Sequence, residues 1–232
     1  MPKVENAAVD RRQFLHTAVA GAVAGIATRS GFWPGFERTL APRVTPTAGT
    51  ALQELLAGNQ RFAANHLTST RRDLPALRER TVDKQEPFAA VLACADSRVP
   101  VELVFDQSIG SIFVVRVAGN IVTPEIIASL EYASAVLGIR ALLVLGHSHC
   151  GAVKAAMKTD AVPGQISSLY SHIRPAVDQS AGDVEKAVEI NARMQAGLLR
   201  GSSTVIREAT TAGKLEVAAG VYDLATGRVT MC

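Results

Sequence analysis

Four short apolar runs divide the chain from residue 88 onward. Each is too short for a buried helix, and most are rich in Val, Ile and Leu, which is typical of strands buried on both faces of a sheet. The predicted strands are Phe88–Ala93, Ser111–Val117, Ala141–Gly146 and Leu215–Leu224.

Between these runs, apolar residues recur at the three-to-four-residue spacing of amphipathic helices. Arg71–Arg80 is strongly charged and is interpreted as a surface connection instead. The predicted helices are Thr50–Asn65, Pro124–Leu137, Gly151–Met157, Ile166–Gln179 and Asp183–Leu199. Buried strands that alternate with helices predict an α/β fold, with a mainly parallel central sheet of about four to five strands flanked by helices.

Residues 1–45 form a segment of different character. Arg11-Arg12 precedes an apolar run of small residues, Ala18–Ala27, that is too short to cross a membrane of about 30 Å. Gly21 and Gly25 disfavour the alternative, an amphipathic or buried N-terminal helix. The segment resembles a twin-arginine export signal followed by a linker, so we expect export to the periplasm or the outer face of the cytoplasmic membrane.

The rest of the chain, residues 46–232, is expected to be a single domain. The net charge of +3 comes entirely from the first 48 residues, so the predicted domain is neutral and has no basic face for nucleic acid. We expect contact with a membrane only through the export signal.

Two polar motifs follow two of the predicted strands. Cys94-Ala95-Asp96-Ser97-Arg98 comes after the first strand, and His147-Ser148-His149-Cys150 comes after the third. The carboxyl ends of parallel strands meet at one edge of a sheet, where ligands bind in open α/β folds. Two thiolates and one imidazole suit a tetrahedral zinc ion with one position left for water, so Cys94, His147 and Cys150 are the predicted Zn²⁺ ligands.

Asp96 and Arg98 stand beside the first of these ligands. An Asp-x-Arg pair elsewhere on a chain is usually a surface ion pair. Next to a zinc thiolate, Arg98 can hold the Asp96 carboxylate ionised and oriented toward water on the metal. We therefore predict that the two residues form a catalytic dyad.

The two motifs together resemble the signature of the β-class carbonic anhydrases, Cys-x-Asp-x-Arg followed by His-x-x-Cys. The resemblance implies that a zinc-bound hydroxide hydrates CO₂ reversibly to bicarbonate and a proton, and that Asp96 can become a conditional fourth ligand at low pH. It also implies a homodimer or homotetramer, with the first predicted helix packed on a partner because its apolar face needs cover. The implied substrate pocket consists of Gln85, Phe113, Tyr132 and Gly151.

Three other interpretations stay open on the sequence. The first is a hydrolase of carbon disulfide or carbonyl sulfide on the same fold. The second is a structural zinc site closed by His149, although a chain turn that brings residues 147, 149 and 150 to one metal is awkward. The third is a thiol redox protein, which the lack of a Cys-x-x-Cys motif disfavours.

Overall fold

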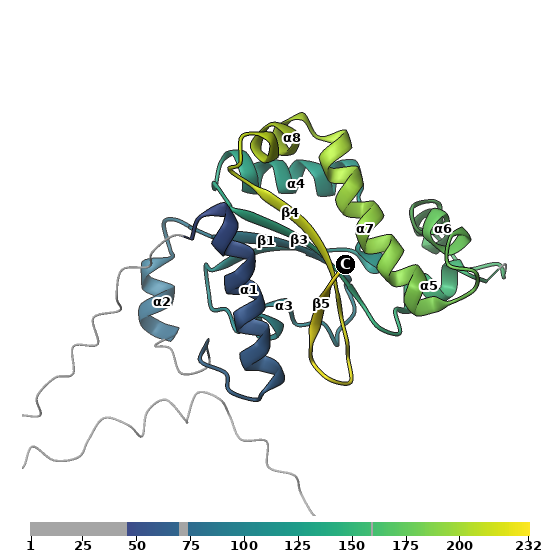
Figure 1. Cartoon of the computed structure of the whole chain (residues 1–232), viewed down its shortest axis with the longest axis horizontal. Helices are drawn as coiled ribbons and strands as arrows, with labels where there is room; N and C mark the ends of the chain where they lie inside the picture. The colour runs from purple at the N-terminus through teal and green to yellow at the C-terminus, as the bar shows by residue number, and fades with distance from the viewer. Residues whose placement is uncertain (1–45, 70–73, 159) are drawn as a thin grey trace, which may run out of the picture. The chain divides into compact units, whose positions relative to one another are not determined.

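The computed structural model describes residues 46–69, 74–158 and 160–232, so the predicted export segment lies outside the described residues. These residues form a five-stranded sheet with helices on both faces (Figure 1). The strands are β1 (Ala89–Ala93), β2 (Ile112–Arg116), β3 (Ala141–His147), β4 (Glu216–Tyr222) and β5 (Val229–Met231). The helices are α1 (Ala48–Ala63), α2 (Leu74–Arg80), α3 (Val101–Val104), α4 (Pro124–Ala135), α5 (Gly151–Ala156), α6 (Tyr170–Asp178), α7 (Val184–Ser202) and α8 (Thr204–Thr211), with short 3₁₀ turns η2 (Ala118–Asn120) and η3 (Ile166–Leu169).

The strand order β2-β1-β3-β4-β5 places the two motif-bearing strands next to each other. β1 and β3 pair in parallel, with Ala93 opposite Leu145, so both chains leave the sheet at the same edge. The mainly parallel α/β architecture is confirmed. β5 was not predicted: it pairs antiparallel with β4 through a tight turn in which Gly227 adopts a φ of +73°.

Side chains alternate between the two faces of the sheet, as the pleat requires. Leu143 and Leu145 face α1 and α3, whereas Leu142 and Val144 face α4, α7 and α8. All five residues of β1 and all seven of β3 are buried, which explains why both strands appear in the sequence as continuous apolar runs.

Some predicted details differ from the structure. The charged stretch expected to be a surface connection contains helix α2, all of whose residues are at least partly exposed. Helices α3 and α8 were not predicted, because each is too short to show a clear period. The predicted helix 166–179 begins with the 3₁₀ turn η3 before α6.

Part of the apolar face of α1 is covered within the chain itself. Ala51 and Leu55 are fully buried against the sheet, and Leu52 and Phe62 pack on the same cluster. Leu52, Leu56 and Phe62 are only partly buried, so the expectation that this helix also packs on a partner subunit stays a prediction. None of the helices in the described ranges is long and apolar enough to cross a membrane.

Candidate metal centre

The three predicted ligands meet at the carboxyl edge of the sheet. Cys94 directly follows β1, His147 is the last residue of β3, and Cys150 immediately precedes α5. Their ligand atoms all lie within 4.8 Å of one another, and the side chains are at most 4% exposed. A set of two sulfurs and one nitrogen at this spacing can hold a transition-metal ion.

The ring of His147 is oriented by its own backbone. Nδ1 lies 3.0 Å from the carbonyl oxygen of Ser148, which accepts a hydrogen bond from the Nδ1–H tautomer. Nε2 is then left with a lone pair, and among the described residues this buried atom has no hydrogen-bond partner. A histidine that donates through one nitrogen and offers the other is the usual arrangement of a metal ligand.

The two cysteines are paired, and their pKa values move in opposite directions. A hydrogen bond from Cys150 lowers the pKa of Cys94 to about 4, with smaller contributions from His147 and the Gly119 N–H, while burial acts in the opposite direction. The same pairing and burial raise the pKa of Cys150 above its usual range. Cys94 is therefore the more readily ionised sulfur, and a metal that binds both sulfurs as thiolates must displace the proton of Cys150.

The turn that carries His147 and Cys150 is fixed from two sides. The Ser148 N–H donates to the Tyr222 carbonyl at 2.9 Å, and the Ser148 Oγ accepts from the Leu224 N–H at 2.9 Å. His149 adopts a left-handed φ of +57°, and its N–H donates to Glu185 Oε1 at 3.0 Å. The His149 ring also lies near Glu185, with Nδ1 3.4 Å from Oε1, so it points away from a role as a fourth ligand.

Asp96 and Arg98 form the predicted pair. Arg98 donates from Nε to Oδ1 at 2.9 Å and from Nη2 to Oδ2 at 2.7 Å, and its backbone N–H also reaches Oδ1. These hydrogen bonds hold the pKa of Asp96 well below its usual range. Asp96 Oδ2 lies 3.8 Å from His147 Nε2, so the carboxylate stands at the centre while Arg98 holds it.

Arg116 supports the loop of the first motif, a role that the motif itself does not predict. Its Nε donates to the Cys94 carbonyl oxygen at 3.0 Å, and Nη2 donates to the Asp96 carbonyl oxygen. The residue stands at the end of β2, next to the end of β1. The segment Arg116–Asn120 also resembles a segment of the β-class carbonic anhydrases, but only the strand order brings Arg116 to this loop.

The predicted pocket residues lie in different places. Gly151 opens α5 directly after the Cys150 ligand. Gln85 is exposed and precedes β1, whereas Cys94 follows it, and a five-residue strand separates them. At about 3.3 Å per residue, β1 alone spans about 17 Å, so within one chain Gln85 and the ligands occupy opposite edges of the sheet.

Phe113 and Tyr132 do lie close together. Their ring centroids are 6.4 Å apart and the rings are tilted by 45°. Phe113 is the second residue of β2 and lies opposite Ala90, near the amino end of β1, and Tyr132 is 46% exposed on α4. The pair forms a half-exposed aromatic surface beside the edge of the sheet.

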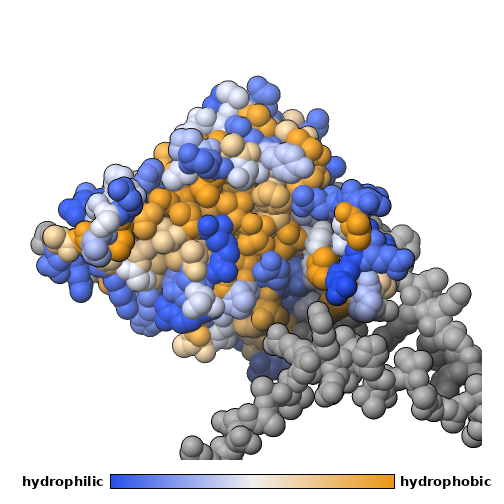
Figure 2. Space-filling view, turned by 180° about the vertical axis from the view of Figure 1, so that it is seen from behind, coloured by the Kyte–Doolittle hydropathy of each residue, from blue (hydrophilic) through white to orange (hydrophobic). Residues whose placement is uncertain are grey.

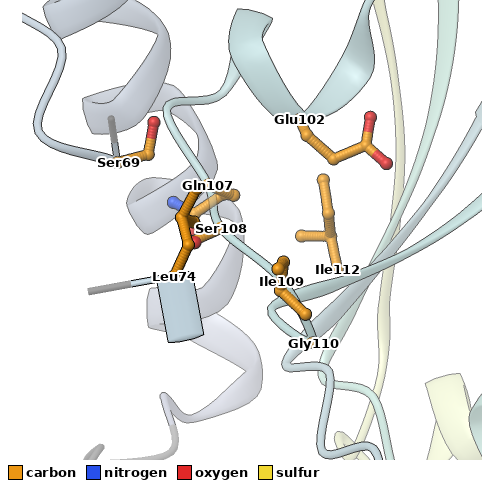
Figure 3. Close-up of a pocket in the computed structure, with 8 residues that line it drawn as sticks. All are labelled: Ser69, Leu74, Glu102, Gln107, Ser108, Ile109, Gly110 and Ile112. Atoms are coloured by element: carbon orange, nitrogen blue, oxygen red, sulfur yellow. The ribbon is translucent and has the colours of Figure 1, made fainter. Parts of the chain in front are cut away.

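A separate hollow of about 320 Å³ lies between α2, α3 and the loop that enters β2 (Figure 3). Its walls include Leu74, Ile109 and Ile112, with Glu102 and Gln107 as polar members. None of the three metal ligands lines it. The hollow is therefore distinct from the metal centre.

Comparison with known proteins agrees with this geometry. A family model described as carbonic anhydrase matches residues 89–229. Carbonic anhydrase 2 of Mycobacterium tuberculosis is 32% identical over 205 residues, which cover 82% of this chain and 94% of that protein. The carbonic anhydrase of Mycolicibacterium smegmatis is 35% identical over 198 residues, covering 81% and 94%.

Solved structures show the same fold. A Coccomyxa β-carbonic anhydrase in complex with acetazolamide matches with a TM-score of 0.62 and 29% identity, over 78% of this chain and 85% of that one. A tetrameric β-carbonic anhydrase of Sordaria macrospora matches with a TM-score of 0.62 and 24% identity, over 78% and 96%.

The chain therefore belongs to the carbonic anhydrase family, and its fold is that of the β class. It is a lyase that hydrates carbon dioxide. The family match does not favour the alternative hydrolase or the structural metal protein.

Proposed function

We propose that the metal of this carbonic anhydrase is zinc, held by Cys94, His147 and Cys150. The observation that carries the proposal is the buried set of three ligand atoms within 4.8 Å, in which His147 Nε2 has no hydrogen-bond partner among the described residues. Two sulfurs and one imidazole suit zinc better than magnesium or calcium, which prefer oxygen ligands. Three protein ligands also leave one position open, as in catalytic zinc sites.

When bound, zinc would supply Lewis-acid activation of water, which lowers the pKa of that water to about 7. The chain itself then orients the nucleophile. Asp96 is ionised and accepts the proton of the attacking oxygen in a hydrogen bond, which points a lone pair at CO₂. Arg98 keeps the carboxylate in this state, because both of its donors already occupy the two Asp96 oxygens.

Gly151 directly follows Cys150 and opens α5. As the first residue of α5, it has an N–H without an acceptor inside the helix, and an added Cβ would meet no atom within 4 Å. We propose that this N–H donates to an oxygen of CO₂ or bicarbonate. At low pH Asp96 is proposed to leave Arg98 and close the site as a fourth ligand.

We further propose that the enzyme is a homodimer or homotetramer, in which Gln85, Phe113 and Tyr132 serve the site of a neighbouring copy. This follows from their distance from the ligands of their own chain. β2 supports the proposal, because it forms one edge of the described sheet and its four apolar residues are only half-buried. Figure 2 shows a broad apolar area across the middle of the face seen from behind.

Stopped-flow measurement of CO₂ hydration, with zinc determined by elemental analysis, tests the central proposal. The purified protein is expected to hold about one zinc per chain and to lose activity when the metal is removed, with recovery on adding Zn²⁺ back. Full activity in metal-free protein, or recovery with another divalent metal but not with zinc, would overturn it.

A further inference from the structure

Helix α7 presents two buried amide side chains to the loop between β2 and α4. Asn191 and Gln195 are one helical turn apart, and each is only 1% exposed. Gln195 Nε2 donates to Asn191 Oδ1 at 3.1 Å, so the two amides form one connected unit. Neither residue belongs to the metal centre described above.

The amide pair is hydrogen-bonded to Gly119, the residue that contacts the candidate ligand Cys94. Asn191 Nδ2 donates to the Gly119 carbonyl oxygen at 2.9 Å. On its other side, the Gly119 N–H donates to Cys94 Sγ at 3.3 Å. A continuous set of buried hydrogen bonds therefore leads from α7 to the sulfur, with one residue, Gly119, between the amide and the ligand.

Gly119 can donate to the sulfur only in an unusual backbone conformation. Its φ is +77°, which disfavours any other residue, and an added Cβ would lie 2.6 Å from Ile173 Cδ1. The conformation therefore depends on restraints from outside the turn. Asn191 supplies one such restraint through its hydrogen bond to the Gly119 carbonyl oxygen.

Gln195 supplies the other restraint. Its Oε1 accepts from the Val122 N–H at 2.8 Å, at the far end of the same loop, and its Nε2 also donates to the His172 carbonyl oxygen on α6 at 3.1 Å. The side chain thereby fixes both the loop and the helix that carries Ile173. Asn191 and Gln195 together leave Gly119 little freedom to turn its N–H away from Cys94.

We infer that Asn191 and Gln195 are positioning residues for the Cys94 ligand, and that they set how tightly the centre holds its metal by keeping the Gly119 N–H on the sulfur. Hydrogen bonds to a ligand orient it and adjust the charge that it gives to the metal. The inference rests on the proposed role of Cys94 as a ligand. It concerns retention of the metal, so it can be tested without measuring turnover.

The test is the rate at which the zinc-loaded enzyme loses Zn²⁺ to an excess of chelator. Asn191→Ala removes the restraint on Gly119, and release is expected to be about 10- to 100-fold faster, the usual effect of losing such a supporting contact. The Co²⁺-loaded variant should also show a shifted thiolate-to-metal absorption band. Gln195→Met keeps the length of the side chain but removes both its N–H donors and its oxygen acceptor, and it should change both readouts in the same direction.

Leu199→Ala is the matched control. Leu199 lies on α7 two turns beyond Asn191 and is fully buried, but it packs between apolar residues away from the site. This variant is expected to lower the unfolding midpoint while leaving the release rate within about twofold of the wild type and the Co²⁺ band unshifted. If Asn191→Ala changes the rate of Zn²⁺ release no more than Leu199→Ala does, the inference is wrong. If Asn191→Ala does not fold, the same comparison is made with Gln195→Met.

Cys94→Ser separates this inference from the proposed function. If Cys94→Ser retains its metal as the wild type does, the ligand assignment itself fails. If Cys94→Ser loses the metal while the two amide variants behave like the control, only the role of Asn191 and Gln195 is refuted.

Discussion

At the scale of single residues, the centre depends on which atom of each side chain is already engaged. His147 uses Nδ1 for the backbone and keeps Nε2 for the centre, whereas His149, only two positions later, turns to Glu185. The left-handed φ of His149 separates the two rings, so neighbouring histidines acquire different tasks. The orientation of the ring, as well as the residue type, therefore decides which histidine can act as a ligand.

Removing a ligand should empty the site, whereas removing the neighbouring histidine should not. Cys94→Ala, His147→Ala and Cys150→Ala are each expected to lose most of the bound zinc, because two remaining ligands cannot hold it in competition with water. His149→Ala should keep about one zinc per chain. Elemental analysis after dialysis measures this, and full occupancy in Cys150→Ala would contradict the assignment.

Asp96→Asn should separate metal binding from catalysis. An amide cannot accept a proton in the same way while also facing the donors of Arg98, so CO₂ hydration is expected to fall at least about 100-fold. Zinc should be retained, because Asp96 is not one of the three ligands. Stopped-flow assays with parallel metal analysis test this, and near-native activity would rule out the role of Asp96.

At the scale of elements, α1 joins the loop after α3 to the C-terminal hairpin. Asn59 donates to the carbonyl oxygens of Val104 and Gly227 and accepts from the Val229 N–H. Arg61 donates to Asp106, whose side chain is fully buried. These polar contacts fix both β5 and the loop between α3 and β2 to helix α1.

Asp106 should make stability depend on pH. Burial raises its pKa, but hydrogen bonds from Arg61, Ser69 and Thr68 outweigh that effect and hold the pKa below its usual range. A carboxyl group with a lowered pKa stabilises the fold above its unfolded pKa of about 3.9 and loses this contribution as the pH falls. Asp106→Asn should therefore be less stable by about 1–3 kcal/mol at pH 7, with a smaller difference below pH 4.

Urea unfolding at neutral and acid pH measures this difference. Asp83→Asn, at an exposed position, is the control and should match the wild type at both values. A difference between Asp106→Asn and the wild type that stays constant down to acid pH would show that ionisation of Asp106 does not contribute.

At the scale of the whole molecule, the two ends of the parallel strands carry different chemistry. The three candidate metal ligands lie at the carboxyl edge, while Gln85 lies beyond the amino end of β1. One copy of the chain thus separates residues that the proposed reaction needs together. In the proposed assembly, copies that meet through the half-buried edge strand β2 would bring these residues together.

Analytical ultracentrifugation should therefore give a mass of at least two chains of about 24.5 kDa each. Val114→Lys places a charge on the edge strand and is expected to yield smaller species with reduced activity. Val82→Lys, at a position that is 77% exposed, should leave mass and activity unchanged. A fully active monomer at high dilution would refute the assembly proposal.

We also propose that the chain folds and binds its metal in the cytoplasm and then crosses the inner membrane through the twin-arginine route. Two thiolates are loaded most readily where cysteines stay reduced. Changing both Arg11 and Arg12 to Lys should leave active, zinc-loaded enzyme inside the cell, measured by fractionation. If the double variant is exported like the wild type, the first 45 residues are not such a signal.

Much of this protein follows from the sequence alone, because buried parallel strands produce apolar runs and catalytic loops follow their carboxyl ends. Those two regularities located Cys94, His147 and Cys150, and the Asp96–Arg98 pair is local enough to be predicted from its spacing. The tertiary structure alone decided what lies around them: Arg116 under the first loop, Glu185 beside His149, and the amides of α7 behind Gly119. It also decided that α1 covers its own sheet. These partners are far apart in the chain and leave no periodic trace, because only the order of the strands and the packing of the helices bring them together.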